Sequence, residues 1–192
     1  MNYSNIKHCD IANGAGVRTT LFASGCRRHC PFCFNQVAAR FDAGQPFTRE
    51  VEDDIIASLG PSYVDGLSVL GGEPLERENQ AALAPFLERV RAEAPGKGVW
   101  LYSGFTWEEI MGEAPVALPY DQSQSPATEW TPRILACLDV LVDGPFVQAQ
   151  KDISLRFRGS ANQRLIDVPA SLETGEVVLW RDDPLFETHG LG

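Results

Sequence analysis

The segment from Gly25 to Asn35 reads GCRRHCPFCFN and carries three of the chain's five cysteines in the spacing C-x3-C-x2-C. Positions i, i+4 and i+7 share one face of an α-helix, so a buried helical stripe of thiols is one interpretation. Pro31 argues against a helix, because proline removes a backbone donor and clashes with the preceding turn, and Gly25 permits a sharp turn. We therefore predict an irregular loop that brings the three thiols toward one point.

Three converging thiolates suit an iron–sulfur cluster, which cysteine sulfur binds well. An ordinary four-iron cluster takes four cysteines, so Cys26, Cys30 and Cys33 leave one iron open to a ligand from outside. The alternative is a zinc-binding interaction module, in which Cys9 or His29 completes a tetrahedron with the three thiols. The spacing alone leaves both kinds of site open.

Length and composition limit the other functions. The 192 residues, 44% hydrophobic and 22% charged, are typical of a soluble globular chain with one domain, or with a domain and a short appendage. A net charge of −10 weighs against nucleic acid as the main partner. No apolar run approaches the roughly 20 residues that span a bilayer, so we expect no membrane association. The lack of an apolar N-terminal segment and the odd cysteine count predict a cytoplasmic protein.

Strands and helices alternate along most of the chain. Strands are predicted over residues 19–24, 66–70, 98–104 and 139–144, with further candidates at 154–158 and 176–180. Helices are predicted over 49–59, 79–94, 106–111 and 132–138, with Pro85 near a turn or kink. Residues 112–130 are rich in proline and polar residues and predict a loop insertion. This alternation is typical of an α/β fold with a mostly parallel sheet.

Several polar or glycine-rich segments each follow a predicted strand. They are the cysteine loop, Gly71-Gly72-Glu73-Pro74, Tyr102-Ser103-Gly104 and Asp143-Gly144. Parallel strands with right-handed crossovers open on one face, so these segments gather there. The chain is too short for the roughly 250 residues of an eight-unit barrel, and we predict a partial, open (β/α) barrel.

A longer pattern surrounds the cysteines: Gly14-x-Gly16-x-Arg18-x3-Phe22-x2-Gly25-Cys26-x3-Cys30-x2-Cys33-x-Asn35. This pattern resembles the signature of radical S-adenosylmethionine (SAM) activases that install glycyl radicals. Several further segments resemble the members that activate anaerobic ribonucleoside-triphosphate reductase. They are Met1-Asn2-Tyr3, Gly44–Thr48, Asp139–Gly144, Lys151-Asp152 and Arg158-Gly159-Ser160-x-Asn162-Gln163. The resemblance runs from Met1 to about Val168, with an interruption over residues 112–130.

The resemblance implies a fold, cofactors and partners. The fold is a barrel of the radical SAM type in residues 1–168, with residues 169–192 as a C-terminal extension. Cys26, Cys30 and Cys33 bind a [4Fe-4S] cluster whose open iron chelates SAM. One electron then cleaves SAM to methionine and a 5′-deoxyadenosyl radical, which removes a hydrogen atom from a glycine of the partner reductase's large subunit. A small donor such as flavodoxin or ferredoxin supplies the electron.

The remaining candidate site residues concern SAM. Gly71 and Gly72 allow the backbone to approach the methionine portion, and Glu73 accepts a hydrogen bond from its ammonium group. Phe32, Cys33 and Phe34 are predicted beside the ligand, although the two phenylalanines are equally well explained as packing residues. Asp143, at a strand end, has two interpretations: it orients the ligand or binds a cation, or it caps a helix or loop. No acid–base dyad is required, and we assign no catalytic side chain. Activation of another glycyl-radical enzyme, such as pyruvate formate-lyase, or radical chemistry on a small molecule is the alternative enzymatic function.

Overall fold

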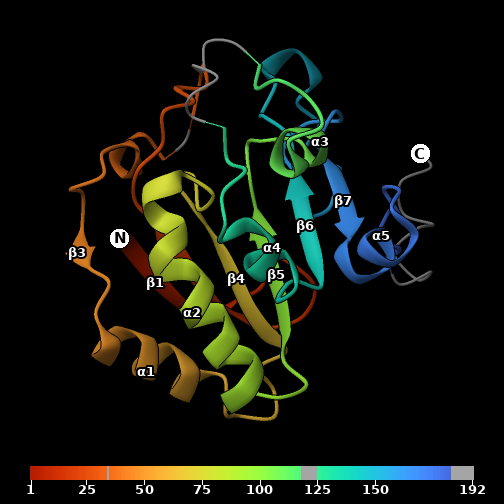
Figure 1. The fold of residues 1–192 in the computed structure, drawn as a ribbon. Helices are drawn as coiled ribbons and strands as arrows, with labels where there is room; N and C mark the ends of the chain where they lie inside the picture. Colours follow the sequence, from red (N-terminus) through yellow and green to blue (C-terminus); the bar gives the residue numbers. More distant parts are fainter. Residues whose placement is uncertain (34, 118–124, 183–192) are drawn as a thin grey trace.

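A computed structural model describes residues 1–33, 35–117 and 125–182. Its centre is a seven-stranded sheet in the order β3-β1-β2-β4-β5-β6-β7. The strands are β1 (Asn2–Asp10), β2 (Arg18–Ala23), β3 (Gln45–Pro46), β4 (Gly66–Gly71), β5 (Gly98–Tyr102), β6 (Val140–Asp143) and β7 (Arg164–Asp167). Figure 1 shows the two ends of the order, β3 and β7, on opposite sides of the molecule, so the sheet is open.

The sheet is parallel at its centre and antiparallel at its edges. Strands β2, β4, β5 and β6 pair in parallel. Strands β1 and β3 on one side and β7 on the other pair antiparallel. All six residues of β2 and all four of β6 are buried, as expected for parallel strands with both faces covered. The α/β class with parallel central strands is confirmed.

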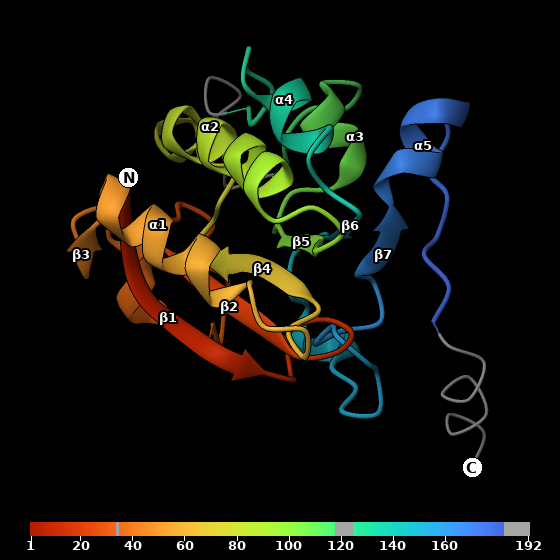
Figure 2. The same ribbon diagram turned by 90° about the horizontal axis from the view of Figure 1, so that it is seen from below.

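Helices cover one face of this sheet. They are α1 (Arg49–Ser58), α2 (Arg77–Glu93), α3 (Trp107–Met111) and α4 (Thr131–Leu135), and Figure 2 shows all four on the same side. Leu21, Val69 and Leu101 of the strands pack there against buried residues of α2 such as Phe86 and Leu87. This is the main hydrophobic core, and its burial is the dominant favourable term in folding.

A smaller aromatic cluster covers the other face. Trp100, Val140 and Val142 pack there with Phe157 and Trp180. The ring of Trp100 meets those of Phe157 and Trp180 edge to face, with centroids 5.3 and 5.0 Å apart. The segment between β6 and β7 and the backbone beyond α5 (Val168–Thr174) therefore close this face.

Most predicted central elements are present, with shifts of a few residues at their ends. Pro85, predicted near a turn or kink, lies inside α2, and Thr106 caps α3 through a capping box with Glu109. The predicted strand at 154–158 is wrong, because Phe157 adopts a left-handed backbone conformation (φ 59°) and packs against Trp100. The strand predicted at 176–180 is reduced to one bridge between Leu179 and Ile166.

The edge elements β1, β3, β7 and α5 are absent from the sequence prediction. Strand β1 carries mostly polar side chains with exposed or half-buried positions, so it lacks the apolar alternation that signals a strand. The described ends of the predicted insertion, residues 112–117 and 125–130, pack on the core. There the Pro126 carbonyl accepts a hydrogen bond from Gln80 Nε2 at 2.7 Å.

Arg18 joins three strands at the amino ends of the sheet, opposite the cysteine loop. Arg18 is only 2% exposed. Its guanidinium donates to Ser68 Oγ (2.7 Å) and to the carbonyls of Leu67 and Gly98 (both 2.8 Å). Burial lowers the pKa of Arg18 to about 10, which still leaves it charged at neutral pH. Gly14 and Gly16 belong to the turn that precedes Arg18. The Gly14-x-Gly16-x-Arg18 part of the pattern therefore stabilises the fold and lies away from the cysteine loop.

We expect Arg18→Met to lower the free energy of unfolding by about 3 kcal/mol, because the acceptors on β4 and β5 lose a charged donor. Urea unfolding followed by circular dichroism measures this change. Arg40→Met is the matched control, because the Arg40 side chain is 77% exposed and bonds only locally to Asp42. Wild-type stability of Arg18→Met would contradict the role of Arg18 as a cross-strand anchor.

Candidate metal and cofactor site

The cysteine loop leaves the carboxyl end of β2 and follows an irregular path. Gly25 has φ +96°, and a Cβ there would lie 2.4 Å from the ring of Phe41, so only glycine fits. His29 and Phe32 adopt left-handed backbone conformations, with φ of 46° and 63°. The predicted irregular loop is confirmed, and a helical stripe of cysteines is excluded.

Backbone contacts fix the base of the loop to its neighbours. The N–H groups of Gly25 and Cys26 donate to the carbonyls of Ala38 and Ala39 on the 3-10 helix η1 (Gln36–Ala39), at 2.8 and 2.9 Å. In the other direction, the Glu73 N–H donates to the Gly25 carbonyl at 2.7 Å. The first cysteine therefore lies between η1 and the end of β4.

Gly72 makes this approach possible. A Cβ on Gly72 would lie 2.5 Å from the Gly25 carbonyl oxygen and 2.7 Å from that of Ala38, closer than real contacts allow. A Cβ on Gly71, which has φ +121°, would lie 2.4 Å from the Ala23 carbonyl oxygen. The sequence prediction placed these glycines against a ligand. The structure adds a different requirement, because the cysteine loop packs on Gly72 and the end of β2 packs on Gly71.

Three side chains at the start of α2, those of Glu76, Glu78 and Asn79, hold the loop from outside. The Arg27 guanidinium pairs with Glu76 at 2.7 Å and also with Glu78, and the Arg27 N–H donates to Glu76 Oε1 at 2.7 Å. Asn79 Nδ2 donates to the carbonyls of Ser24 and Glu73, both at 3.0 Å, and so joins the loop to the end of β4. The loop is thus anchored on both sides of Cys26.

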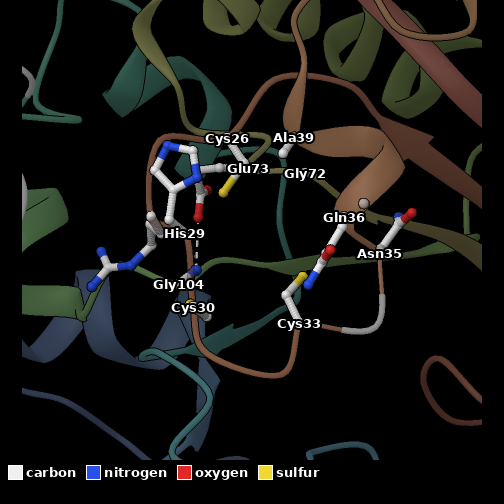
Figure 3. A pocket seen from close by; sticks show the side chains of 12 residues that line it. Cys26, His29, Cys30, Cys33, Asn35, Gln36, Ala39, Gly72, Glu73 and Gly104 are labelled. Atoms are coloured by element: carbon white, nitrogen blue, oxygen red, sulfur yellow. Dashed lines mark hydrogen bonds between the residues drawn. The ribbon is translucent and has the colours of Figure 1, made fainter.

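The three thiols line one cavity of about 430 Å³ at the carboxyl edge of the central strands. Figure 3 shows Cys26, Cys30 and Cys33 around it, together with Gly72 and Glu73. The other lining residues are Arg28, His29, Asn35, Gln36, Ala39, Gly71 and Gly104. The predicted gathering of strand ends is confirmed for the cysteine loop, for residues 71–73 and for Gly104. The volume lies in the range of small-cofactor sites.

The donor set fits a cluster better than a single ion. Among the described residues, no three His, Cys, Asp or Glu side chains lie close enough together to hold one metal ion. A zinc ion requires its ligands to meet at one point. A four-iron cluster instead binds each thiolate on a different iron, so its thiols are spread around a cavity. Of the two alternative zinc ligands, Cys9 is exposed near the β1 end that pairs with Arg18, away from the loop, whereas His29 lines the cavity.

The surroundings of the thiols disfavour free thiolates. Burial, with a smaller contribution from the Glu73 carboxylate, raises the pKa of Cys26 to about 12. Burial also raises the pKa of Cys30, while the Arg28 charge and the Phe146 N–H act in the opposite direction. A bound metal cation stabilises the thiolate, so these cysteines ionise together with metal binding.

Glu73 is the buried carboxylate of this cavity, with only 1% of the residue exposed. Its Oε1 accepts from Leu75 N–H and Ser103 Oγ, both at 2.9 Å, and its Oε2 accepts from Gly104 N–H at 2.7 Å. Burial raises the pKa of Glu73 to about 7, although these donors oppose the shift. Glu73 therefore ties the end of β4 to the end of β5, and its predicted contact with a ligand ammonium stays a prediction.

Of the other predicted residues, those that the structure describes lie outside the cavity lining. Phe32 is 75% exposed and is absent from the cavity lining, and Phe34 falls outside the described residues. Asp143 accepts from the Trp107 N–H at 2.7 Å and pairs with Arg164, so it caps α3. Of its two interpretations, the cap is the one that the contacts support.

The sequence prediction missed Arg28, Asn35, Gln36 and Ala39 as lining residues. Gly104 was predicted at this face as part of a strand end. Gln36 and Ala39 belong to η1, which has no sequence signal of its own. Arg28 was hidden because a charged residue inside a loop is ordinarily solvent-exposed.

Comparison with known proteins agrees with this site. Residues 12–166 match the family described as a 4Fe-4S single cluster domain. The anaerobic ribonucleoside-triphosphate reductase-activating protein of Escherichia coli K12 is 40% identical over 165 residues, which cover 85% of this chain and 96% of the relative. The Vibrio cholerae protein of the same name is 39% identical over the same shares, and that of phage T4 is 32% identical over 86% of this chain and 93% of its own.

The chain belongs to the family of anaerobic ribonucleoside-triphosphate reductase-activating proteins. The matched region contains the whole cysteine loop, β4 and the segment after it, and all four central strands. Within the described part of this family member, no helix has the length and apolarity needed to cross a bilayer.

We expect Gly72→Ala to displace the cysteine loop, since the new Cβ meets backbone on both sides. The variant should lose about 2 kcal/mol of stability, as overpacked sites do, and should incorporate less iron during anaerobic reconstitution. Gly98→Ala is the matched control, because a Cβ there would have its nearest neighbour at an ordinary 3.7 Å. Iron analysis and urea unfolding test both variants, and normal iron content in stable Gly72→Ala protein would contradict the packing role.

Proposed function

We propose that this protein is a radical SAM activase that generates a glycyl radical on the large subunit of anaerobic ribonucleoside-triphosphate reductase. The observation that carries the proposal is the arrangement of three thiols from one loop around a cavity shared with residues 71–73. Three ligands leave a four-iron cluster one open coordination position. Membership of the activating-protein family supports the same target.

Each part of the cavity has a role in this proposal. Cys26, Cys30 and Cys33 bind a [4Fe-4S] cluster, and SAM occupies the space between the open iron and Gly71–Glu73. The Glu73 carboxylate orients the SAM ammonium group, a charge-assisted hydrogen bond that a buried carboxylate makes well. When bound, the cluster supplies the electron that cleaves SAM, which leads to removal of a hydrogen atom from a glycine of the partner. The chain itself holds the reactants and limits the access of water.

The same proposal includes the type of fold and the division of the chain into segments. We assign residues 1–168 to a partial barrel of the radical SAM type, residues 112–130 to an insertion and residues 169–192 to an extension. The four parallel strands with helices on one face support this assignment. A small redox protein such as flavodoxin or ferredoxin donates the electron, and the thiol-rich site suits the reducing cytoplasm.

A glycyl-radical assay tests the function most directly. The protein is reconstituted anaerobically with iron and sulfide, reduced, and mixed with SAM and the large subunit of the reductase. We expect a glycyl-radical signal by electron paramagnetic resonance (EPR) that depends on SAM. A signal with pyruvate formate-lyase in place of the reductase would reassign the target. Stoichiometric zinc without iron in the purified protein, and no cluster after reconstitution, would support the zinc module instead.

We expect Cys26→Ala, Cys30→Ala and Cys33→Ala each to abolish reductive cleavage of SAM, because each removes one of three cluster ligands. Cleavage is followed as methionine released by the dithionite-reduced protein. Cys9→Ala is the matched control, since it removes a thiol that is exposed and outside the cavity. Full cleavage in any of the three loop variants would refute the assigned ligand set.

A further inference from the structure

The wall of the cavity contains a buried positive charge that the proposed chemistry has not used. Arg28 is the only lysine or arginine among the described residues that line the cavity. Its side chain is 7% exposed, although a solvated position is available to most loop arginines. Burial of a guanidinium is costly unless neighbouring groups stabilise it, so this position needs a physical explanation.

Three neighbours define the path of this side chain. The guanidinium carbon lies 4.8 Å from the centroid of the Phe105 ring, a cation–π contact. Nη1 lies 3.7 Å from Oε2 of the buried Glu109. The aliphatic stem crosses Gly104, because a Cβ on that residue would lie 2.4 Å from Arg28 Cδ. The absence of a side chain at Gly104 therefore lets the guanidinium lie along the cavity wall.

The charge acts on the groups that face the cavity. Burial raises the pKa of Cys30 and that of Glu73, and in both cases the Arg28 charge opposes this rise. A charge in a buried wall is weakly screened by solvent and salt, so it acts on any other charge placed in the cavity.

We propose that Arg28 tunes the reduction potential of the bound cluster. Gly104 leaves the space that sets the position of the Arg28 side chain, and Glu109 offsets part of its charge. One-electron reduction of the cluster by an external reductant, such as dithionite, adds one negative charge to the cavity. The Arg28 guanidinium stabilises that reduced state relative to the oxidised one. Glu109 and Glu73 act in the opposite direction, and the contact at 3.7 Å with Glu109 offsets part of the charge. Charge and hydrogen bonding near the sulfurs are known determinants of cluster potentials. This inference rests on the proposed cluster site.

An EPR-monitored redox titration of the reconstituted protein tests the proposal. We expect Arg28→Gln to make reduction at least tenfold less favourable, which is about 59 mV toward lower potential for one electron. Arg28→Lys keeps the charge and should restore most of the potential. Glu109→Gln should shift the potential in the opposite direction, to higher values. Gly104→Ala should lower it with no change of charge, because the new Cβ pushes Arg28 from the wall.

Arg40→Gln is the matched control for loss of an arginine, since this side chain is exposed to solvent and pairs with Asp42. Its potential should equal that of the wild type. An unchanged potential in Arg28→Gln and Glu109→Gln, with normal iron content, would overturn the proposal. If Arg28→Gln loses its cluster, Glu109→Gln becomes the test. A shift to higher potential supports the proposal, and an unchanged or lower potential overturns it. Failure of the wild type to assemble any cluster would instead overturn the proposed function, so the two failures are distinguishable.

Discussion

The hydrogen bond from the Glu73 N–H to the Gly25 carbonyl, at 2.7 Å, joins the two strand ends on which the site depends. It requires two backbones to approach more closely than any side chain permits, which is why Gly72 stands between them. The same approach places Cys26 beside the residues proposed to bind SAM. Anchoring by Arg27 and Asn79 then fixes the loop from outside. The protein chain itself thus supplies much of the order of the site.

The site illustrates which features follow from local sequence and which do not. Pro31 and Gly25 were sufficient to predict an irregular loop, and the rule for parallel strand ends predicted that Glu73 and the cysteines share one edge. The reason for Gly72 was not predictable, because its close neighbours, Gly25 and Ala38, are more than 30 residues away in the sequence. Left-handed conformations at His29 and Phe32 were equally hidden, since few residues other than glycine adopt them and a bulky phenylalanine does so rarely.

The differences between the predicted and the observed strands have similar physical causes. Residues 154–158 alternate polar and apolar side chains like a strand, but Phe157 is held instead by the aromatic cluster on Trp100. Strand β1 gives a weak signal because it lies near the sheet edge with mostly polar residues, and its register is set by pairing with β2. In both cases long-range packing overrode the local pattern, as it does most often at sheet edges and in loops.

The charge of the site also differs from the charge of the chain. The sequence carries a net charge of −10, yet its cysteine loop contains two adjacent arginines. Arg27 is directed outward and neutralised by Glu76 and Glu78, whereas Arg28 enters the cavity wall. Neighbouring residues of one type therefore differ in role: Arg27 holds the loop, and Arg28 places its side chain in the cavity wall. Because Gly104 determines which way Arg28 runs, the charge that acts on the cavity depends on a residue that has no charge and no side chain.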